Sequence, residues 1–333
     1  MKENKLLNID IDDIKDAYSR IKNKIIFTPL LESKELNEKF NTRILVKAEN
    51  LQKTGSFKFR GAANSITVLS SIQKSNGIIC FSSGNHGQAI AFAARSLNTN
   101  AIVVMPNTAP KIKIDKTKQY ATEVILFEGS RENMEKFTLD LSKETGRHLI
   151  RPFDDKTIIA GQGTIGIEII KELKSKKIQI DAVLVPCSGG GLLAGASIAI
   201  KNYDNTIKLH PVEPEGFDDT ARSLNKNKIL INDNKSMSIC DSLLVPKPGK
   251  ITFSINSKLS SKGFCVPDSA VYKAIKIAKK MLNLTLEPGG AIGLAAIINN
   301  QLPKNYKNVI VIASGGNIDP ENFDKILNGK TLQ

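Results

Sequence analysis

The chain has 333 residues, of which 41% are hydrophobic, and its 47 Lys and Arg against 33 Asp and Glu give a net charge of +14. This length accommodates a substantial core and two domains. The longest apolar stretches stop short of the roughly 20 residues that cross a bilayer, and the N-terminus lacks the apolar core of a signal peptide. These features exclude a transmembrane protein, and we expect a cytoplasmic one.

The cysteines and the positive charge limit the function classes further. Four cysteines are scattered without a CxxC pair and only three histidines are present, which argues against a zinc site or a disulfide framework. The lysines are spread along the chain, aromatic residues are 5% and Trp is absent. Because no nucleic-acid-binding motif accompanies the charge, we expect no specific nucleic-acid partner.

Short apolar strands alternate with amphipathic helices along the chain. This alternation predicts an α/β protein with parallel sheets that are covered on both faces. The expected strands are residues 78–81, 101–105, 123–127, 182–186, 207–212 and 309–313. The expected helices are residues 87–97, 131–145, 163–174, 192–202 and 269–282.

The α/β units fall into two sets, before and after about residue 147. We expect a small, mobile domain of residues 65–146, and a large domain that combines residues 1–64 with 147–333. The segment before Leu51 is expected to return and pack on the second set. Residues 225–262 are less regular, with Pro246, Pro248 and several Asn, and are interpreted as a loop, a lid or a plain surface excursion.

Lys58 lies in a tightly turned, apolar segment in which Phe57 and Phe59 flank it and Gly55 and Gly61 bracket it. An amine in such a place loses hydration, so its protonated form is disfavoured and it becomes a better nucleophile towards a carbonyl. The alternative is a lysine whose stem lies along the surface while its head reaches water. This segment alone does not decide between the two.

A glycine-rich loop, Cys187-Ser-Gly-Gly-Gly-Leu-Leu-Ala-Gly195, follows an expected strand and precedes an expected helix. Backbone N–H groups of glycines can converge on an anion, and the helix N-terminus adds a favourable dipole. The spacing matches neither the dinucleotide pattern nor the P-loop. We interpret it as a phosphate-binding loop, because a plain tight turn rarely requires three consecutive glycines.

Two more loops have the same placement after a strand. Ser82-Ser83-Gly84-Asn85-His86 offers N–H groups and hydroxyls that suit a carboxylate, and Ser314-Gly-Gly-Asn317 follows another apolar strand. Each loop alone is compatible with ordinary turn chemistry. Three such loops at the carboxyl ends of strands, together with an apolar lysine, indicate a site for a phosphorylated carbonyl cofactor.

With these motifs the chain resembles, from about Ile25 to Pro320, the fold-type II pyridoxal-phosphate enzymes, in the branch of threonine/serine dehydratases and serine racemase. The resemblance implies two open, twisted, mostly parallel sheets covered by helices, as in the β subunit of tryptophan synthase. It also implies pyridoxal 5'-phosphate (PLP) as the cofactor and a homodimer as the assembly.

The resemblance assigns cofactor contacts to particular residues. Lys58 would bind the cofactor aldehyde as an imine, with Phe57 beside the ring. Asn85 would contact the ring hydroxyl and Ser314 the pyridine nitrogen, where a neutral hydroxyl makes the ring a weaker electron sink than a carboxylate does. The phosphate would be held by Ser188, Gly189, Gly190, Gly191 and Leu192.

The resemblance also implies a substrate site. Lys58, once freed by a β-hydroxy amino acid, would remove the α-proton before hydroxide leaves, yielding a 2-oxo acid and ammonia. Ser83 stands where serine racemase carries a second catalytic base. Dehydratases share this serine, so binding of the substrate carboxylate or shaping of the loop is an equal alternative. The implied substrate contacts are Ser82, Ser83, Gly84, Asn85, His86 and Arg131.

An acidic loop, Glu213-Pro-Glu-Gly-Phe-Asp-Asp219, resembles the divalent-cation loop of serine racemase. Its implied ligands are Glu213, the Phe217 carbonyl and Asp219, hard oxygen donors that suit Mg²⁺ or Ca²⁺. The alternative is an acidic helix start. Two residues depart from the family pattern: Ser188 and Ser242 stand where the family has glycine, and Ser242 puts the substrate preference in doubt.

The leading interpretation is an ammonia-lyase that acts on L-threonine or L-serine. A close second is action on threo-3-hydroxyaspartate, because Arg131 resembles a substrate-facing arginine of serine racemase and could pair with a second carboxylate. The alternative is that Arg131 is an arginine at a helix start that makes a solvent-exposed ion pair. Serine racemisation is the third possibility, and a cofactor- or amino-acid-binding protein without turnover is the non-enzyme alternative.

Overall fold

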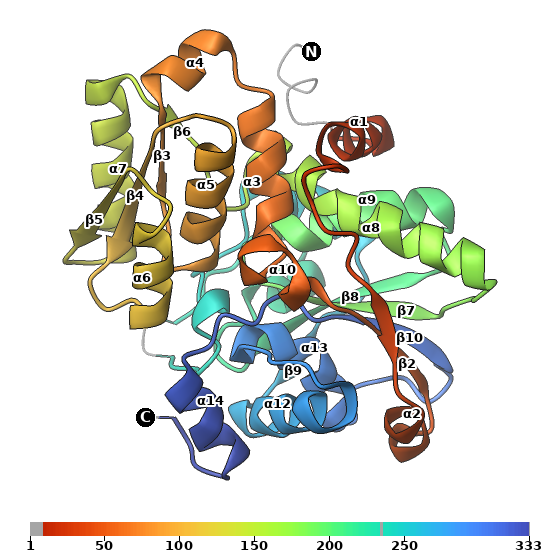
Figure 1. Ribbon diagram of the computed structural model, residues 1–333. Coiled ribbons are helices and arrows are strands. Elements are labelled where there is room, and N and C mark those ends of the chain that lie inside the picture. The colour runs from red at the N-terminus through yellow and green to blue at the C-terminus, as the bar shows by residue number, and fades with distance from the viewer. Residues whose placement is uncertain (1–8, 234–235, 333) are drawn as a thin grey trace.

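The computed structural model describes residues 9–233 and 236–332, in which ten strands form two separate sheets (Figure 1). The smaller sheet and its helices lie at the upper left of Figure 1, and the larger sheet lies at the lower right. Both sheets are flanked by helices, as the α/β prediction requires. Within these ranges none of the helices combines the length and apolar character needed to cross a membrane.

The smaller sheet is parallel throughout, with strand order β5-β4-β3-β6. Successive side chains of a strand point to opposite faces, so Ile78 and Cys80 pack towards α3 and α5, while Ile79 and Phe81 pack towards α7. The strands are β3 (Ile78–Phe81), β4 (Ala101–Pro106), β5 (Glu123–Phe127) and β6 (His148–Leu149). The helices are α4 (Ser71–Asn76), α5 (Asn85–Ser96), α6 (Lys111–Lys118) and α7 (Arg131–Thr145).

The larger sheet has strand order β1-β2-β10-β7-β8-β9, and only the edge strand β1 is antiparallel to its neighbour. The segment before Leu51 packs here, as expected, because β2 pairs with β10 in parallel. The strands are β1 (Leu30–Glu32), β2 (Arg43–Lys47), β7 (Ala182–Pro186), β8 (Lys208–Pro214), β9 (Phe264–Val266) and β10 (Asn308–Ile312).

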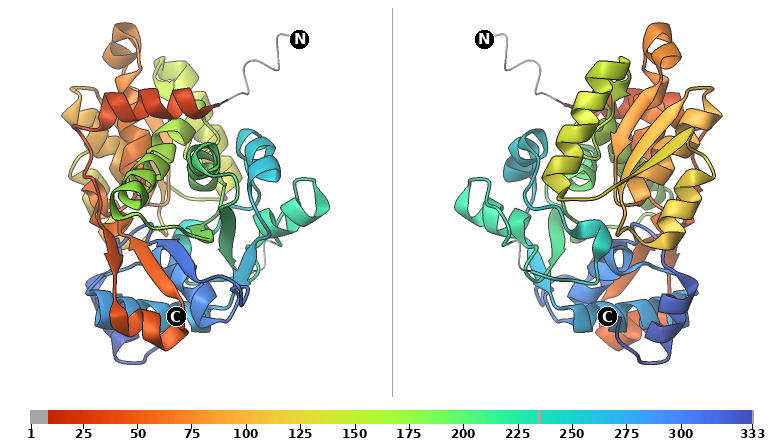
Figure 2. Two further views of the ribbon diagram at one scale, coloured as in Figure 1. Left: turned by 90° about the vertical axis from the view of Figure 1, so that its right-hand side faces the viewer. Right: turned by 90° about the vertical axis from the view of Figure 1, so that its left-hand side faces the viewer.

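Helices cover both faces of the larger sheet (Figure 2). Val183 and Val185 pack towards α8 and α9, whereas Ala182 and Leu184 pack towards α12 and α13. The remaining helices are α1 (Ile11–Ile21), α2 (Lys34–Phe40), α3 (Lys58–Thr67), α8 (Lys156–Lys176), α9 (Gly191–Tyr203), α10 (Asp219–Lys226), α11 (Lys250–Leu259), α12 (Asp268–Leu282), α13 (Pro288–Ile298) and α14 (Pro320–Leu327). Short 3-10 turns span η2 (Glu49–Leu51), η3 (Lys53–Gly55) and η4 (Asp241–Leu243).

Helix α8 begins seven residues before the expected start at 163. The Asp155 side chain accepts N–H groups of Thr157 and Ile158 and caps this earlier start. The two glycines near this start allow close packing: a Cβ on Gly161 would lie 2.6 Å from the Cα of Gly61 on α3, and one on Gly163 would lie 2.8 Å from the carbonyl oxygen of Gly195.

The interpretation of residues 225–262 as a loop, lid or surface excursion is wrong for its last third. Residues 250–259 form α11, whose Thr252, Ile255 and Asn256 are buried, and α11 packs against α9. The Asp154 carboxylate accepts N–H groups at the start of this helix, including that of Ile251 at 2.8 Å. Residues 234 and 235 lie outside the described residues.

Candidate active site

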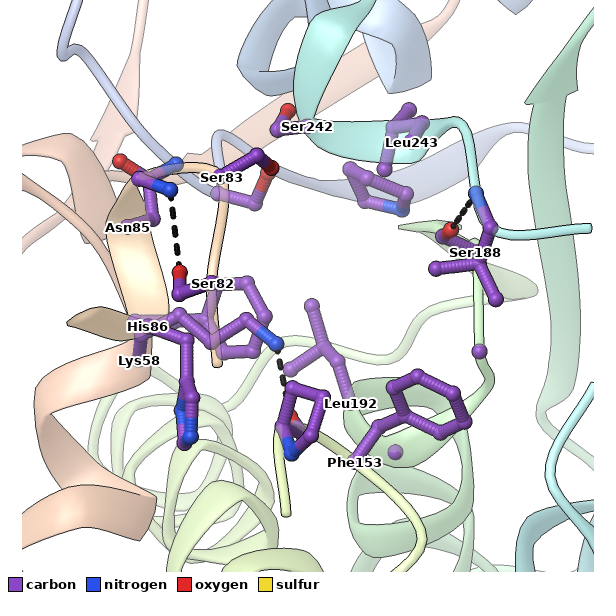
Figure 3. A pocket seen from close by; sticks show the side chains of 18 of the residues that line it. Lys58, Ser82, Ser83, Asn85, His86, Phe153, Ser188, Leu192, Ser242 and Leu243 are labelled. Atoms are coloured by element: carbon purple, nitrogen blue, oxygen red, sulfur yellow. Dashed lines mark hydrogen bonds between the residues drawn. The ribbon is translucent and has the colours of Figure 1, made fainter. Parts of the chain in front are cut away.

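The carboxyl ends of β3, β7 and β10 face a cavity between the two sheets (Figure 3). This cavity has a volume of about 890 Å³, counting its opening to solvent. It brings together Lys58, the serine loop that we define as residues 82–86, and the glycine loop that we define as residues 187–191. Ser314 also lines it, so the three loops singled out in the sequence meet in space.

Lys58 is the first residue of α3, and β10 fixes where this helix begins. Ser56 forms an isolated bridge with Gly315, and the N–H of Phe57 donates to the carbonyl of Ser314 at 3.1 Å. The Lys58 Nζ lies 5.2 Å from the centre of the Phe57 ring and donates to the carbonyl of Pro152 at 2.8 Å.

The Lys58 amine has no carboxylate partner among the residues that the structure describes. Although part of the side chain faces the cavity, burial of the amine, together with the nearby positive charge of Arg131, lowers its pKa to about 8. Lys58 therefore deprotonates more readily than an exposed lysine, which is what a nucleophile or base requires.

A buried charge network, defined here as Lys47, Glu49, Arg60 and Glu168, supports the start of α3. Arg60 donates to Glu49 at 2.7 Å and to Glu168 at 2.8 Å, and Lys47 donates to Glu168 at 2.6 Å. All four side chains are buried. Sequence reasoning missed this network, since nothing local marks these residues as partners over more than 100 positions.

The serine loop is held by one of its own hydroxyls. Ser82 Oγ accepts the N–H groups of Gly84 at 3.0 Å and Gly87 at 2.9 Å, which directs the start of α5 towards the cavity. Burial lowers the pKa of His86 to about 3, with a further contribution from Lys58, so its ring is neutral. The N-terminal end of α5 consequently offers N–H groups and a partial positive charge to a carboxylate.

Asn85 links the serine loop to the larger sheet. Its Nδ2 donates to Glu287 at 2.5 Å, and its Oδ1 accepts from Asn317 at 2.8 Å. Glu287 also pairs with Lys113 at 2.9 Å, and Lys113 pairs with Asp241 at 2.5 Å. One N–H of Asn85 stays available to a ligand.

Glu287 and Lys113 also line the cavity, and neither was singled out in the sequence. The only local signal was the Glu-Pro-Gly-Gly segment, in which Glu287 occupies the N-cap position and Pro288 opens α13.

The carbonyl groups of the glycine loop are bonded to side chains behind it. Thr220 donates to the Ser188 carbonyl at 3.3 Å, Thr252 to that of Gly189 at 2.6 Å, and the Asn256 amide to that of Gly190 at 3.2 Å. In the part of the chain that the structure describes, the N–H groups of residues 188–190 have no acceptor. They are free to bind an anion.

Two positions of this loop require glycine. Gly190 has a φ of +90°, and a Cβ on Gly189 would overlap the ring of Phe153. Ser188 is tolerated because its hydroxyl lies towards residue 245, where it accepts the Val245 N–H at 3.2 Å. Its own O–H proton is not committed by that bond.

Ser314 and Ser242 lie near each other around Gly289. Ser314 Oγ donates to the Gly289 carbonyl at 3.4 Å, and a Cβ on Gly289 would overlap Ser242 Oγ. Both hydroxyls line the cavity. Ser242 therefore occupies the space that a side chain at position 289 would need.

Arg131, at the start of α7, lines both the cavity and a neighbouring hollow that opens beside Lys247 and Lys250. No ion pair or hydrogen bond joins its guanidinium to another described residue. Burial lowers its pKa, and Glu135 opposes this effect from the next turn. A guanidinium placed like this is suited to an anionic ligand.

The acidic loop brings two of its expected ligands together. The Glu213 carboxylate accepts the N–H groups of Thr220 and Ala221, and Asn232 donates to Asp219 at 2.5 Å. Burial raises the pKa of Asp219 to about 7, and burial followed by repulsion from Asp219 raises that of Glu213. In the described ranges no group of three or more His, Cys, Asp or Glu gathers as a metal site.

This arrangement is that of an enzyme with a nucleophilic lysine facing an anion cradle. A family model described as pyridoxal-phosphate dependent enzyme matches residues 21–315. The chain belongs to this family.

The curated relatives divide among several activities. The chain is 38% identical to a serine racemase of Arabidopsis thaliana, over 93% of each sequence. It is 37% identical to an L-threonine ammonia-lyase of Thermotoga maritima, over 96% of this chain and 78% of the relative. It is 36% identical to an L-threo-3-hydroxyaspartate ammonia-lyase of Saccharomyces cerevisiae, over 96% of each.

Among solved structures, maize serine racemase superimposes with a TM-score of 0.90 at 34% identity, over 96% of this chain and 97% of the other. The fold is that of the fold-type II PLP enzymes, so the predicted fold class is confirmed. The chain is a PLP-dependent enzyme of the lyase type, which confirms the choice of an enzyme over a binding protein.

Proposed function

We propose that this enzyme eliminates the β-hydroxyl of L-threonine or L-serine and releases a 2-oxo acid and ammonia. The observation that carries the proposal is Lys58, a cavity-facing amine with a lowered pKa and no carboxylate partner in the described chain. Its position beside the serine loop supports a role as the base that takes the α-proton of the amino acid.

The residues present fit the cofactor. When bound, PLP supplies an electrophilic carbon to the amino group and withdraws electrons from the α-carbon. The unpaired N–H groups of the glycine loop, with Leu192 beyond them, fit its phosphate, and Phe57 fits one face of its ring. Asn85 and Ser314, which both line the cavity, each offer a polar contact, for the ring hydroxyl and the ring nitrogen respectively.

The serine loop and Lys58 are proposed to have different roles in the reaction. The N–H groups of Ser83, Asn85 and His86, which have no acceptor among the described residues, bind the α-carboxylate and fix the α-hydrogen towards Lys58. Lys58 accepts that proton and returns it to the departing β-hydroxyl, which leaves as water when the Cβ–O bond breaks. A second water then hydrolyses the imine that remains to the 2-oxo acid and ammonia. Ser83 faces the cavity from the same loop and is proposed to bind the carboxylate. Elimination needs one base, which is Lys58, whereas racemisation would need Ser83 as a second base.

A second candidate substrate is threo-3-hydroxyaspartate. The unpaired guanidinium of Arg131, which lines the cavity, favours it because a second carboxylate would complete an ion pair there. The similarity to the yeast hydroxyaspartate ammonia-lyase is consistent with this candidate.

The test is release of 2-oxo acid from L-threonine, L-serine and both 3-hydroxyaspartate diastereomers, with D-serine formation measured alongside. Wild type is compared with Lys58→Ala and Arg131→Gln. Turnover of threonine or serine that Arg131→Gln retains and Lys58→Ala loses supports the first proposal. Preference for a hydroxyaspartate that Arg131→Gln abolishes supports the second, and D-serine as the main product would refute both.

We also propose a divalent cation, Mg²⁺ or Ca²⁺, at Glu213, the Phe217 carbonyl and Asp219. Two buried carboxylates with raised pKa values support it, because a cation would relieve the cost of their ionisation. In the described part of the chain, the Oδ2 atom of Asp219 is buried without a hydrogen-bond partner, so its lone pairs are available to a cation.

We propose that the enzyme is a cytoplasmic homodimer. Ile26, Phe27 and Leu51 are each at least 40% exposed, and the Gln52 side chain bonds both backbone groups of Ile26, so the two segments that carry these residues lie side by side. Such an apolar patch supports contact with a second copy. Light scattering of the purified protein tests the assembly.

The expected division into a large domain of residues 1–64 and 147–333 and a small, mobile domain of residues 65–146 remains a proposal. The separate sheets support it, although β6 at His148–Leu149 belongs to the smaller sheet and lies just beyond the expected boundary.

A further inference from the structure

The carbonyl groups of the glycine loop are bonded to residues outside the cavity. Thr252 and Asn256, which hold the carbonyls of Gly189 and Gly190, do not line the cavity. The N–H of Gly249 adds a second donor to the Gly189 carbonyl at 3.2 Å, and the N–H of Ala194 adds a second donor to the Gly190 carbonyl at 2.9 Å. The loop is therefore restrained from behind, through its acceptors.

A restraint on a carbonyl also orients an N–H group. In a planar trans peptide the carbonyl of one residue and the N–H of the next point in opposite directions. When Thr252 and Asn256 bind the carbonyls of Gly189 and Gly190 on the outer side, the N–H groups of Gly190 and Gly191 are directed inward. Gly191 opens α9, where an N–H has no acceptor within the helix.

The two side chains occupy one face of a helix. Thr252 and Asn256 are four residues apart on α11, and they are 0% and 1% exposed. Burial of a hydroxyl and an amide costs free energy unless both are hydrogen-bonded, and an apolar pair would pack against α9 without that cost. Among the described residues the Asn256 Oδ1 atom has no hydrogen-bond partner, so the bond from Nδ2 to the loop is the contact that its amide makes.

We propose that Thr252 and Asn256 are positioning residues for the cofactor phosphate. They act through the glycine loop, by holding its N–H groups in the inward orientation before the phosphate arrives. This inference rests on the proposed phosphate-binding role of the glycine loop and is independent of which amino acid is the substrate. Both residues should affect binding of PLP, and leave binding of pyridoxal, which lacks the phosphate, unchanged.

The experiment measures dissociation constants of PLP and pyridoxal for the full-length enzyme after cofactor removal, followed by visible absorbance. Thr252→Val removes the hydroxyl and keeps the shape, and Thr252→Ser restores a donor. We expect Thr252→Val to weaken PLP binding roughly tenfold, with pyridoxal within about twofold of wild type, as one lost hydrogen bond predicts. Asn256→Leu should act in the same direction, and Thr252→Ser should recover most of the affinity.

The matched control is Thr138→Val. Thr138 is equally buried, but its hydroxyl bonds the Met134 carbonyl within α7, remote from the glycine loop, so its loss should not change PLP affinity. PLP affinity within about twofold of wild type in both Thr252→Val and Asn256→Leu would overturn the proposal. So would an equal loss for PLP and pyridoxal, which indicates general damage.

The same experiment is separable from the proposed function. If no amino acid of the substrate panel is turned over, the proposed substrates are refuted, yet a selective loss of PLP over pyridoxal in Thr252→Val still supports the assignment. If threonine or serine is turned over but Thr252→Val does not lose PLP affinity selectively over pyridoxal affinity, only the positioning role of Thr252 and Asn256 is refuted.

Discussion

The Lys58 Nζ donates to the carbonyl oxygen of Pro152 at 2.8 Å, so the amine is held at the cavity wall by a neutral acceptor. A carbonyl contributes far less than a carboxylate to the stability of an ammonium ion. Burial can therefore lower the pKa of Lys58 to about 8 without an opposing ion pair. The chemistry of the site depends on this choice of partner.

The first prediction concerns cofactor loading. Only the deprotonated amine attacks an aldehyde, so the rate at which cofactor-free enzyme binds PLP should rise with pH and level off above about pH 8. Stopped-flow absorbance across pH 6 to 10 measures this rate. For a lysine with an unperturbed pKa, the plateau would begin about 2.5 pH units higher. A rate that keeps rising to pH 10 would contradict the lowered pKa.

The second prediction concerns Arg131, whose positive charge lowers the pKa of Lys58. Arg131→Gln removes that charge, so the midpoint of the loading profile should move to higher pH. The control is Arg151→Gln, because Arg151 lies in the neighbouring hollow and does not line the cavity. An unchanged midpoint in Arg131→Gln would show that burial alone sets the pKa.

The third prediction concerns the buried charge network. Glu168→Gln leaves Lys47 and Arg60 with fewer compensating charges in a buried site, so the free energy of unfolding should fall by about 3 kcal/mol. The matched control is Glu32→Gln, which breaks the half-exposed pair with Arg43 and should cost less than about 1 kcal/mol. Urea unfolding measures both, and equal losses would contradict the argument.

The fourth prediction concerns Ser242 and Gly289. Gly289→Ala should lower the free energy of unfolding by roughly 1–3 kcal/mol and reduce turnover, because the added Cβ overlaps Ser242 Oγ. Adding Ser242→Gly removes the overlap and should restore most of the stability. Urea unfolding of the two single variants and the double variant tests the pair. Additive losses in the double variant would mean that the two positions are independent.

Much of the fold was predictable because its signals are local. Apolar runs such as Ile78–Phe81 and Ala182–Pro186 form the strands at the expected residues, since a strand buried on both faces needs a continuous apolar sequence. Helix α11 was missed because two of its buried positions, Thr252 and Asn256, are polar residues that resemble loop residues in a sequence. Tertiary hydrogen bonds, not propensity, hold them in place.

The same distinction applies to the site. Lys58, the serine loop and the glycine loop carry local patterns, and they line one cavity. Glu287 and Lys113 escaped notice because their meaning lies in an ion pair between residues 174 positions apart, which only the folded chain brings within 2.9 Å. Long-range partners of this kind leave no periodicity or spacing to detect.

The last prediction concerns the acidic loop. If a divalent cation binds Glu213 and Asp219, saturating Mg²⁺ or Ca²⁺ should raise the free energy of unfolding, by about 2.7 kcal/mol at a hundred times the dissociation constant. Asp219→Asn removes a buried ligand and should abolish this gain. Asp218→Asn is the control, because Asp218 is the neighbouring acid and pairs with Arg222 at 3.1 Å instead. Thermal unfolding in chelator, Mg²⁺ and Ca²⁺ measures the three proteins. If the cation still stabilises Asp219→Asn but no longer stabilises Asp218→Asn, Asp218 is the ligand and the proposed site is wrong. If the cation does not stabilise the wild type, the proposed cation site is refuted.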